Sequence, residues 1–182
     1  MKYIVLVFLI VPFVVNSPRL SAENDNGLYD YDVEEKVQEL GIELTIPNQP
    51  NNNYVHAVQS GNLLFLSGSG PISDKKVITG KVGADLSIEQ GYEAARLTAI
   101  NQLSVLKTQI GDLNRVERIV KVLGMVNANS SFAEHPKVIN GFSDLMVEVF
   151  GDRGKHARSA IGVASLPRDI ACEIELIVQI KE

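Results

Sequence analysis

The sequence predicts an α+β domain in which two long helices cover one face of a mixed β-sheet. Apolar residues recur at helical spacing over two long segments, 87–110 and 135–150. Apolar or alternating segments of strand length lie before, between and after these helices. The resulting order of strand pair, helix, strand, helix and strand pair places both helices against one sheet, which makes a two-layer domain.

A short helix, a connector and a β-hairpin are expected before the first long helix. Residues 31–40 have helical spacing, and Gly41 is a typical helix stop. Segment 42–53 contains two prolines and several asparagines, which favour an extended connector. Residues 54–59 and 63–68 flank a Ser-Gly-Asn turn, a pattern typical of a hairpin.

The central elements have clear boundaries. Ser87 and Gln90 make a capping box at the start of the first long helix, and Gly111 predicts its end. Residues 115–126 are rich in valine and predict a long strand. The second long helix is expected over 135–150, because its apolar residues form a single stripe.

The C-terminal segment 156–180 is expected to form two strands joined by a short Leu-Pro turn. On the first strand, Arg158 shares a face with Ala160 and Gly162, whose small side chains leave open space beside it. A guanidinium offers a planar fork of N–H donors, and such a fork next to open space suits a ligand carboxylate. Arg158 is therefore the first candidate for a binding residue.

The second strand of this segment has two different faces. One is apolar and includes Cys172, the only cysteine, which predicts a buried and inert thiol. The other carries Glu173 and Glu175, and a carboxylate pair in an apolar strand is costly unless it has a partner. One alternative to a binding site is that Glu173 or Glu175 simply neutralises Arg158 across the hairpin.

The N-terminus has the parts of a secretory signal peptide. Lys2 precedes an apolar run over residues 3–15, and a polar stretch then ends in Ala22 before Glu23. The apolar run is too short for a comfortable membrane span. We expect residues 1–22 to be cleaved, which leaves a periplasmic or secreted protein without stable membrane association. An uncleaved anchor is the alternative.

Composition and histidine spacing exclude several classes of function. The chain has 182 residues and a formal net charge of −5, without a run of lysine or arginine, so we expect no nucleic-acid partner. The three histidines, His56, His135 and His156, have no spacing typical of metal ligands. We therefore expect neither a metal site nor a cofactor.

Four motifs in order resemble one known family. They are Asn-Tyr-Val at 53–55, Leu-Ser-Gly at 66–68, Lys-Val-Ile-Asn at 137–140, and Arg-Ser-x-x-x-Val-x-x-Leu-Pro-x-Asp followed by Glu-Ile-Glu at 158–175. Together they resemble the RidA family, whose members are also called YjgF or reactive-intermediate deaminase proteins. The resemblance covers about residues 53–180.

The resemblance implies an architecture as well as a family. It implies a chorismate-mutase-like fold for residues 53–182, preceded by the N-terminal helix and connector of residues 23–52. It also implies a homotrimer with three ligand clefts between subunits. Trimerisation would cover the second face of the apolar strand at 63–66, which has apolar residues on both sides.

The resemblance also assigns roles to five residues. In RidA-like deaminases the residue matching Arg158 binds the carboxylate of a 2-imino or enamine acid, and Glu173 matches the acid-base or water-orienting position. Tyr54 and Ser67 would line the cleft, and Asn140 would support it. Water attacks the imine carbon and ammonia leaves. This chemistry needs no metal or cofactor, because an iminium carbon is already electrophilic.

Two departures from the family pattern keep alternatives open. Ala160 stands where deaminating members usually carry a cysteine, and Ser-Gly-Ser-Gly at 67–70 replaces Ser-Gly-Gln. The leading hypothesis is hydrolysis of acids of the 2-iminobutanoate or 2-aminoacrylate type. The runner-up is a non-catalytic trimer that binds a small carboxylate metabolite in the same cleft. A protein-interaction module is a further alternative, and the acidic composition disfavours a ribonuclease.

Overall fold

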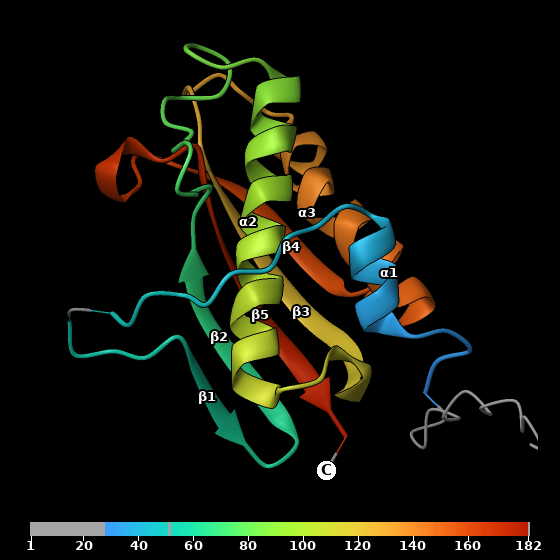
Figure 1. Cartoon of the computed structure of the whole chain (residues 1–182). Helices are drawn as coiled ribbons and strands as arrows, with labels where there is room; N and C mark the ends of the chain where they lie inside the picture. Colours follow the sequence, from blue (N-terminus) through green and yellow to red (C-terminus); the bar gives the residue numbers. More distant parts are fainter. Residues whose placement is uncertain (1–27, 51, 182) are drawn as a thin grey trace, which may run out of the picture.

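The computed structural model describes residues 28–50 and 52–181, so the predicted signal peptide lies outside the described residues. Two long helices, α2 (Ile88–Ile110) and α3 (His135–Phe150), cover one face of a five-stranded sheet (Figure 1), which confirms the predicted two-layer α+β fold. None of the helices in these two ranges is long and apolar enough to cross a membrane. The strands are β1 (Ala57–Ser60), β2 (Leu63–Ser69), β3 (Val116–Asn127), β4 (Ala157–Val163) and β5 (Cys172–Ile180).

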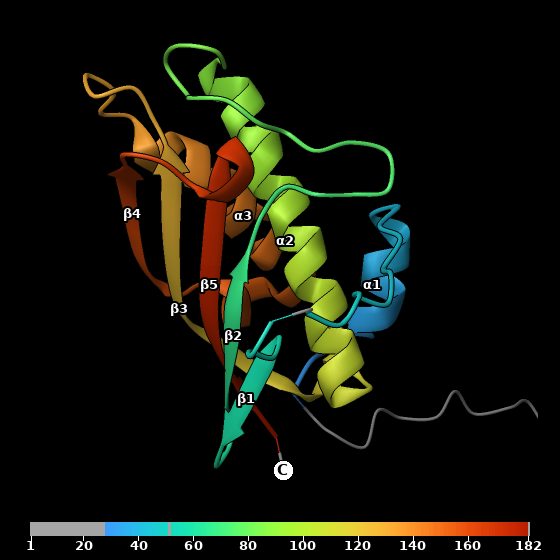
Figure 2. The same ribbon diagram turned by 90° about the vertical axis from the view of Figure 1, so that its left-hand side faces the viewer.

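The strand order across the sheet is β1-β2-β5-β3-β4 (Figure 2). Strands β3 and β4 pair in parallel, and helix α3 is the crossover that connects them. The other neighbouring strands pair antiparallel. The expected hairpin over 156–180 is wrong, because β3 lies between β4 and β5. The two strands are real, but alternation along a strand does not reveal which strand will be its neighbour. Strand β4 is therefore an edge strand, with one side open.

Both long helices begin and end where the local sequence directs. Ser87 Oγ accepts from Gln90 N at 3.2 Å, and Gln90 Oε1 accepts from Ser87 N at 2.8 Å, which confirms the capping box. Gly111 follows α2 with a φ of 78°, a conformation that favours glycine. Helix α3 has the bounds predicted for it.

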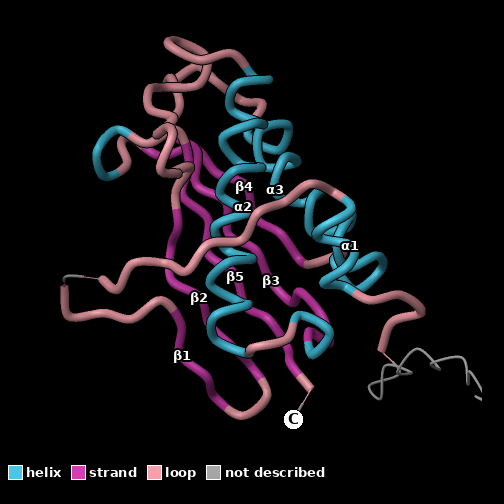
Figure 3. The backbone as a smooth tube through the Cα atoms, viewed as in Figure 1, coloured by secondary structure: helices cyan, strands magenta, loops and turns pink. Residues whose placement is uncertain are grey.

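The N-terminal segment is docked on the domain. Helix α1 (Val33–Glu39) forms within the predicted range, and Glu34 accepts hydrogen bonds from Lys107 Nζ at 2.7 Å and Leu113 N at 2.8 Å. The connector that follows crosses α2 (Figure 3), where Thr45 N donates to Ser104 Oγ at 3.2 Å. Strand β1 then begins at Ala57, three residues later than predicted.

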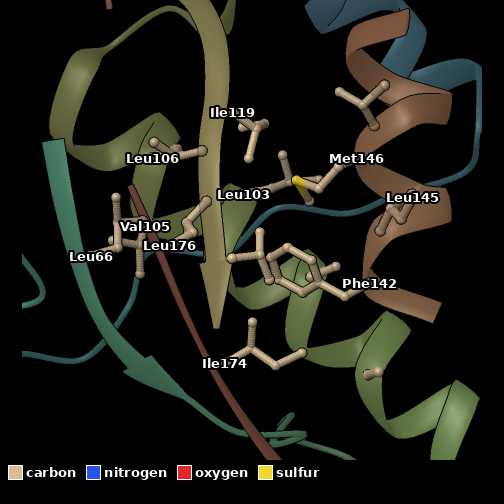
Figure 4. Packing of buried hydrophobic residues seen from close by; sticks show 14 of the residues in the cluster. Leu66, Leu103, Val105, Leu106, Ile119, Phe142, Leu145, Met146, Ile174 and Leu176 are labelled. Carbon is tan, nitrogen blue, oxygen red and sulfur yellow. The ribbon is translucent and has the colours of Figure 1, made fainter. Parts of the chain in front are cut away.

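The hydrophobic core fills the space between the sheet and the helices (Figure 4). It includes buried side chains from α2, α3, β3 and β5: Leu103, Leu106, Ile119, Phe142, Leu145, Met146, Ile174 and Leu176. The opposite face of the sheet is open in the single chain. Phe65 on β2 is 42% exposed and Ile161 on β4 is 44% exposed, so the apolar strand at 63–66 is covered on one side only.

Candidate ligand site at the edge strand

Arg158 is held by α3 at the open edge of the sheet. Its Nη1 atom donates to Asn140 Oδ1 and to Ser143 Oγ, both at 2.9 Å. The other two nitrogens, Nε and Nη2, have no hydrogen-bond partner within residues 28–50 and 52–181. The side chain is only partly buried. One edge of the guanidinium is thus fixed, and the other can bind the two oxygens of a carboxylate.

The space beside Arg158 is smaller than the sequence suggests. Ala160 packs against the core, and the ring of His135 covers Gly162, where an added Cβ would lie 3.0 Å from His135 Cδ2. Beyond this ring an open pocket of about 660 Å³ lies at the end of β4. Its lining includes polar side chains from two loops and the start of α3: Lys81, Asn129, Ser130 and His135.

Glu173 lies half-buried on the open face of the sheet. Its side chain extends over Gly68, at a bulge between β2 and β5, where an added Cβ would lie 2.9 Å from Glu173 Cδ. Burial raises the pKa of Glu173 above its ordinary value, and the negative charge of Glu175 raises it further. A carboxyl group with a raised pKa is better suited to accept and return a proton near neutral pH.

Ser67 lies on the Glu173 side of the molecule, and Tyr54 belongs to the loop that Ser67 contacts. Ser67 directly precedes Gly68, and its hydroxyl donates to Val55 O at 2.7 Å. Tyr54 is the residue before Val55, and it is 53% exposed. The hydroxyl proton of Ser67 is used in this hydrogen bond, while the lone pairs of the hydroxyl oxygen can still accept one from a ligand.

The predicted site residues form two separate groups, and the strand register shows why. Arg158 pairs with Val122, which faces the helices, whereas Glu173 pairs with Met125, three residues further along β3. Side chains an odd number of residues apart on a strand point to opposite faces. The single chain therefore does not bring Arg158 and Glu173 together, and the proposed neutralisation across a hairpin is wrong.

We call the two groups the arginine half and the carboxylate half. The arginine half comprises Arg158 and the α3 side chains that hold it, and the carboxylate half comprises Glu173 and the bulge and loop beside it. Their members are Asn140, Ser143 and Arg158 in the first, and Tyr54, Ser67, Gly68 and Glu173 in the second. In the single chain the two halves lie on opposite faces of the sheet.

Sequence reasoning missed two residues of the site. Ser143 contacts Arg158 directly, and His156 contacts Ser143, with 3.1 Å between Nε2 and Oγ. The spacing contained a signal for both. Ser143 is one helical turn after Asn140, and His156 is two residues before Arg158, so each shares a face with a predicted residue.

Cys172 takes no part in either half. It is fully buried beside Thr98, with 3.5 Å between Sγ and Oγ1. Burial raises the pKa of the thiol to about 12, so the thiolate is not populated at neutral pH, and the prediction of an inert core cysteine is confirmed. Among the residues that the structure describes, no group of three or more His, Cys, Asp or Glu side chains could hold a metal ion.

The chain is thus a small α+β protein in which two helices cover one mixed sheet, with an arginine on the edge strand. A family model described as "YjgF/chorismate_mutase-like, putative endoribonuclease" matches residues 34–180. The chain belongs to the YjgF/RidA family, which confirms the resemblance found in its motifs.

Relatives of known name and structure agree with this assignment. "Protein TCP17" of Trypanosoma cruzi is 43% identical over 146 residues, which are 79% of this chain and 91% of that protein. The "2-iminobutanoate/2-iminopropanoate deaminase" of Escherichia coli is 32% identical over 129 residues, which are 68% of this chain and 84% of the enzyme. The crystal structure of Atu1372 from Agrobacterium tumefaciens, a protein of unknown function, shares 40% identity with a TM-score of 0.76, covering 82% of this chain and 93% of that one.

Proposed function

We propose that this protein hydrolyses small 2-imino or enamine acids in clefts formed between copies of the chain. The observation that carries the proposal is the hydrogen bonding of the Arg158 guanidinium. Nη1 donates to two side chains of α3, and the Nε–Nη2 edge remains open to a ligand. A relative at 32% identity is named a 2-iminobutanoate/2-iminopropanoate deaminase, which supports the substrate class.

In the proposed reaction Arg158 holds the substrate carboxylate and Glu173 orients a water molecule. The water oxygen forms a bond to the imine carbon, and Glu173 accepts the proton that the water loses. Glu173 gives this proton to nitrogen, which leaves a tetrahedral carbinolamine. Glu173 then takes the proton of the carbinolamine hydroxyl and passes it to nitrogen, the C=O bond forms as the C–N bond breaks, and ammonia leaves a 2-oxo acid. No electron is gained or lost, and no covalent intermediate with the protein forms.

The two halves of the site become one cleft if copies of the chain associate through the open sheet face. This face is apolar, with Phe65 and Ile161 more than 40% exposed, and it carries Glu173. An exposed apolar sheet face is normally covered in the assembled state. We propose a homotrimer, in which the arginine half of one copy meets the carboxylate half of the next.

Ile161→Glu tests this assembly. A charge buried against the apolar face of a neighbour is strongly disfavoured, so we expect a monomer in light scattering where the unmodified protein is a trimer. Val77→Glu is the matched control, because Val77 is 48% exposed and lies in the loop between β2 and α2, outside the five strands. A monomeric unmodified protein, or an Ile161→Glu variant of unchanged mass, would rule out this interface.

Glu173→Gln separates catalysis from binding. We expect kcat for ammonia release from freshly generated 2-iminobutanoate to fall by about 100-fold, because glutamine cannot accept a proton, while KM stays close to its original value. Glu175→Gln, on the same face but exposed, is the control and should keep its activity. Equal loss in both variants would assign the effect to lost negative charge rather than to Glu173.

The same substitution has an expected effect on stability. The pKa of Glu173 is raised in the folded protein, so its ionised form opposes folding at neutral pH, and stability recovers as pH falls through the folded pKa. Glu173→Gln removes this cost. We expect a higher Tm than that of the unmodified protein at pH 7 and a smaller difference in mild acid, and thermal unfolding at both pH values checks this.

The non-catalytic alternative rests on Ala160, which stands where the family pattern has a cysteine. If that cysteine side chain assists the reaction, the cleft here would bind carboxylates without turning them over. Binding of 2-oxobutanoate that depends on Arg158, combined with ammonia release no faster than the spontaneous rate, would establish this function instead.

A further inference from the structure

Arg158 is the end of a chain of hydrogen bonds that starts at a backbone carbonyl. Gly154 O lies 2.7 Å from His156 Nδ1, and His156 Nε2 lies 3.1 Å from Ser143 Oγ. Ser143 Oγ in turn lies 2.9 Å from Arg158 Nη1. The chain links the short helix η2 (Gly151–Gly154), β4 and α3 at the arginine half of the site.

Each proton in this chain has one possible position when the imidazole is neutral. A carbonyl oxygen only accepts, so His156 carries its proton on Nδ1, and its Nε2 must accept. A guanidinium only donates, so Ser143 Oγ accepts from Arg158. The hydroxyl proton of Ser143 therefore points to His156 Nε2.

We infer that His156 and Ser143 are positioning residues that aim Arg158 at its ligand. The neutral ring of His156 fixes the direction of the Ser143 hydroxyl, and Ser143 together with Asn140 occupies both protons of Arg158 Nη1. The Nε–Nη2 edge is then the only one left to bind a carboxylate. The identity of the ligand rests on the proposed function, whereas the chain of hydrogen bonds can be measured in the free protein.

The surroundings of His156 favour the neutral ring. Burial lowers the pKa of His156, the hydrogen bond to Gly154 O raises it, and the positive charge of Arg158 lowers it, with burial the largest of the three. Several charged groups on the neighbouring elements have partners elsewhere. Asp152 pairs with Lys155, Arg153 of η2 donates to Leu28 O and Glu117 O, and Lys121 of β3 donates to Ser159. Asp144 and Glu148 of α3 pair with Tyr92 and Arg96.

Protonation of His156 would reverse one hydrogen bond of the chain. Nε2 would then donate to Ser143 Oγ, and the Ser143 proton would lose its acceptor. Two cationic donors would compete for one hydroxyl oxygen, which weakens the hydrogen bond from Arg158 Nη1 to Ser143. Because the pKa of His156 is lowered below 6.5, this protonation happens only in acid. The orientation of the Arg158 guanidinium should therefore be retained at neutral pH. We expect the dissociation constant for 2-oxobutanoate to rise as pH falls below about 6.5. The value of kcat also falls in acid, because Glu173 becomes protonated, so binding rather than kcat reports on His156.

Nitrogen-15 NMR of the intact protein tests the chain without any ligand. We expect a pyrrole-like Nδ1 and a pyridine-like Nε2 for His156. Ser143→Ala removes a hydrogen bond that only the neutral ring can accept, so the measured pKa of His156 should rise. A proton on Nε2, or a pKa that Ser143→Ala leaves unmoved, would overturn the inference whatever the protein's function is.

Kinetics of matched variants test the effect on Arg158. Ser143→Ala and His156→Phe should each raise KM, and the dissociation constant for 2-oxobutanoate, by about tenfold, and the double variant should be no worse than either. His156→Gln keeps an acceptor for Ser143 and should recover most of the affinity and lose the acid dependence. Additive single effects, or no recovery with glutamine, would overturn the inference. NMR could confirm the chain of hydrogen bonds while neither the unmodified protein nor any variant releases ammonia. The proposed deaminase function would then be wrong, and the affinities for 2-oxobutanoate would decide the positioning role.

Discussion

Arg158→Ala should lower kcat/KM for 2-iminobutanoate by about 100- to 10,000-fold. Two charge-assisted hydrogen bonds to the substrate carboxylate are lost, and each is worth about 1.5–3 kcal/mol when it involves an ion. The carboxylate would also enter the cleft without a cation to compensate its lost hydration. Ammonia release at matched protein concentrations measures the loss, and circular dichroism checks that the variant is folded.

Two further variants make this loss specific. Arg158→Lys keeps the positive charge but loses the planar fork, so it should recover only part of the activity. Arg118→Ala removes an exposed arginine of β3 and should change kcat/KM little. If Arg158→Lys matched the unmodified protein, a point charge would suffice and the two-pronged binding mode would be wrong.

Mixing two inactive variants tests whether each cleft combines two copies of the chain. Arg158→Ala chains keep the carboxylate half, and Glu173→Gln chains keep the arginine half. Random reassembly of an equal mixture should give about a quarter of the clefts both intact halves, and hence about a quarter of full activity. Activity that stays at the level of the separate variants after exchange of subunits would show that the halves do not meet between copies.

Local signals were sufficient to predict the helices. The capping box at Ser87 and Gln90, the glycine after α2, and the single apolar stripe of α3 each depend on residues within a few turns of one another. The strands were also found, because alternation is local. Their neighbours were not, since β5 lies between β2 and β3, and β3 separates it from β4, the strand that precedes it in sequence.

The error in strand order explains why the ion-pair alternative was wrong. With β4 and β5 as a hairpin, Arg158 could have faced a carboxylate of β5, and a simple ion pair was a reasonable alternative. The register on β3 instead places them on opposite faces, and this depends on pairings between distant segments. Asn140, by contrast, lies beside Arg158 as the family pattern implies.

Gly141→Ala should cost about 3 kcal/mol in the free energy of unfolding, the largest stability loss that we predict. An added Cβ on Gly141 would overlap the carbonyl oxygen of Tyr92 and lie 3.1 Å from the backbone nitrogen of Arg96. Both atoms belong to the backbone of α2, so the two helices must move apart. Alanine gains about 1 kcal/mol in helix propensity over glycine, which offsets only part of this cost. Urea unfolding at fixed protomer concentration measures the difference.

Gly91→Ala is the matched control, because it places the same methyl group at the contact between the same two helices. There the nearest atoms are methyl groups of Val82 and Val138, at 3.1 Å, and side chains can shift by a few tenths of an ångström where a backbone cannot. We expect a change within about 1 kcal/mol. Equal losses in the two variants would contradict the role of the backbone contact. Any displacement of α3 in Gly141→Ala also moves Asn140 and Ser143 away from Arg158, so the folded fraction of that variant should have a raised KM.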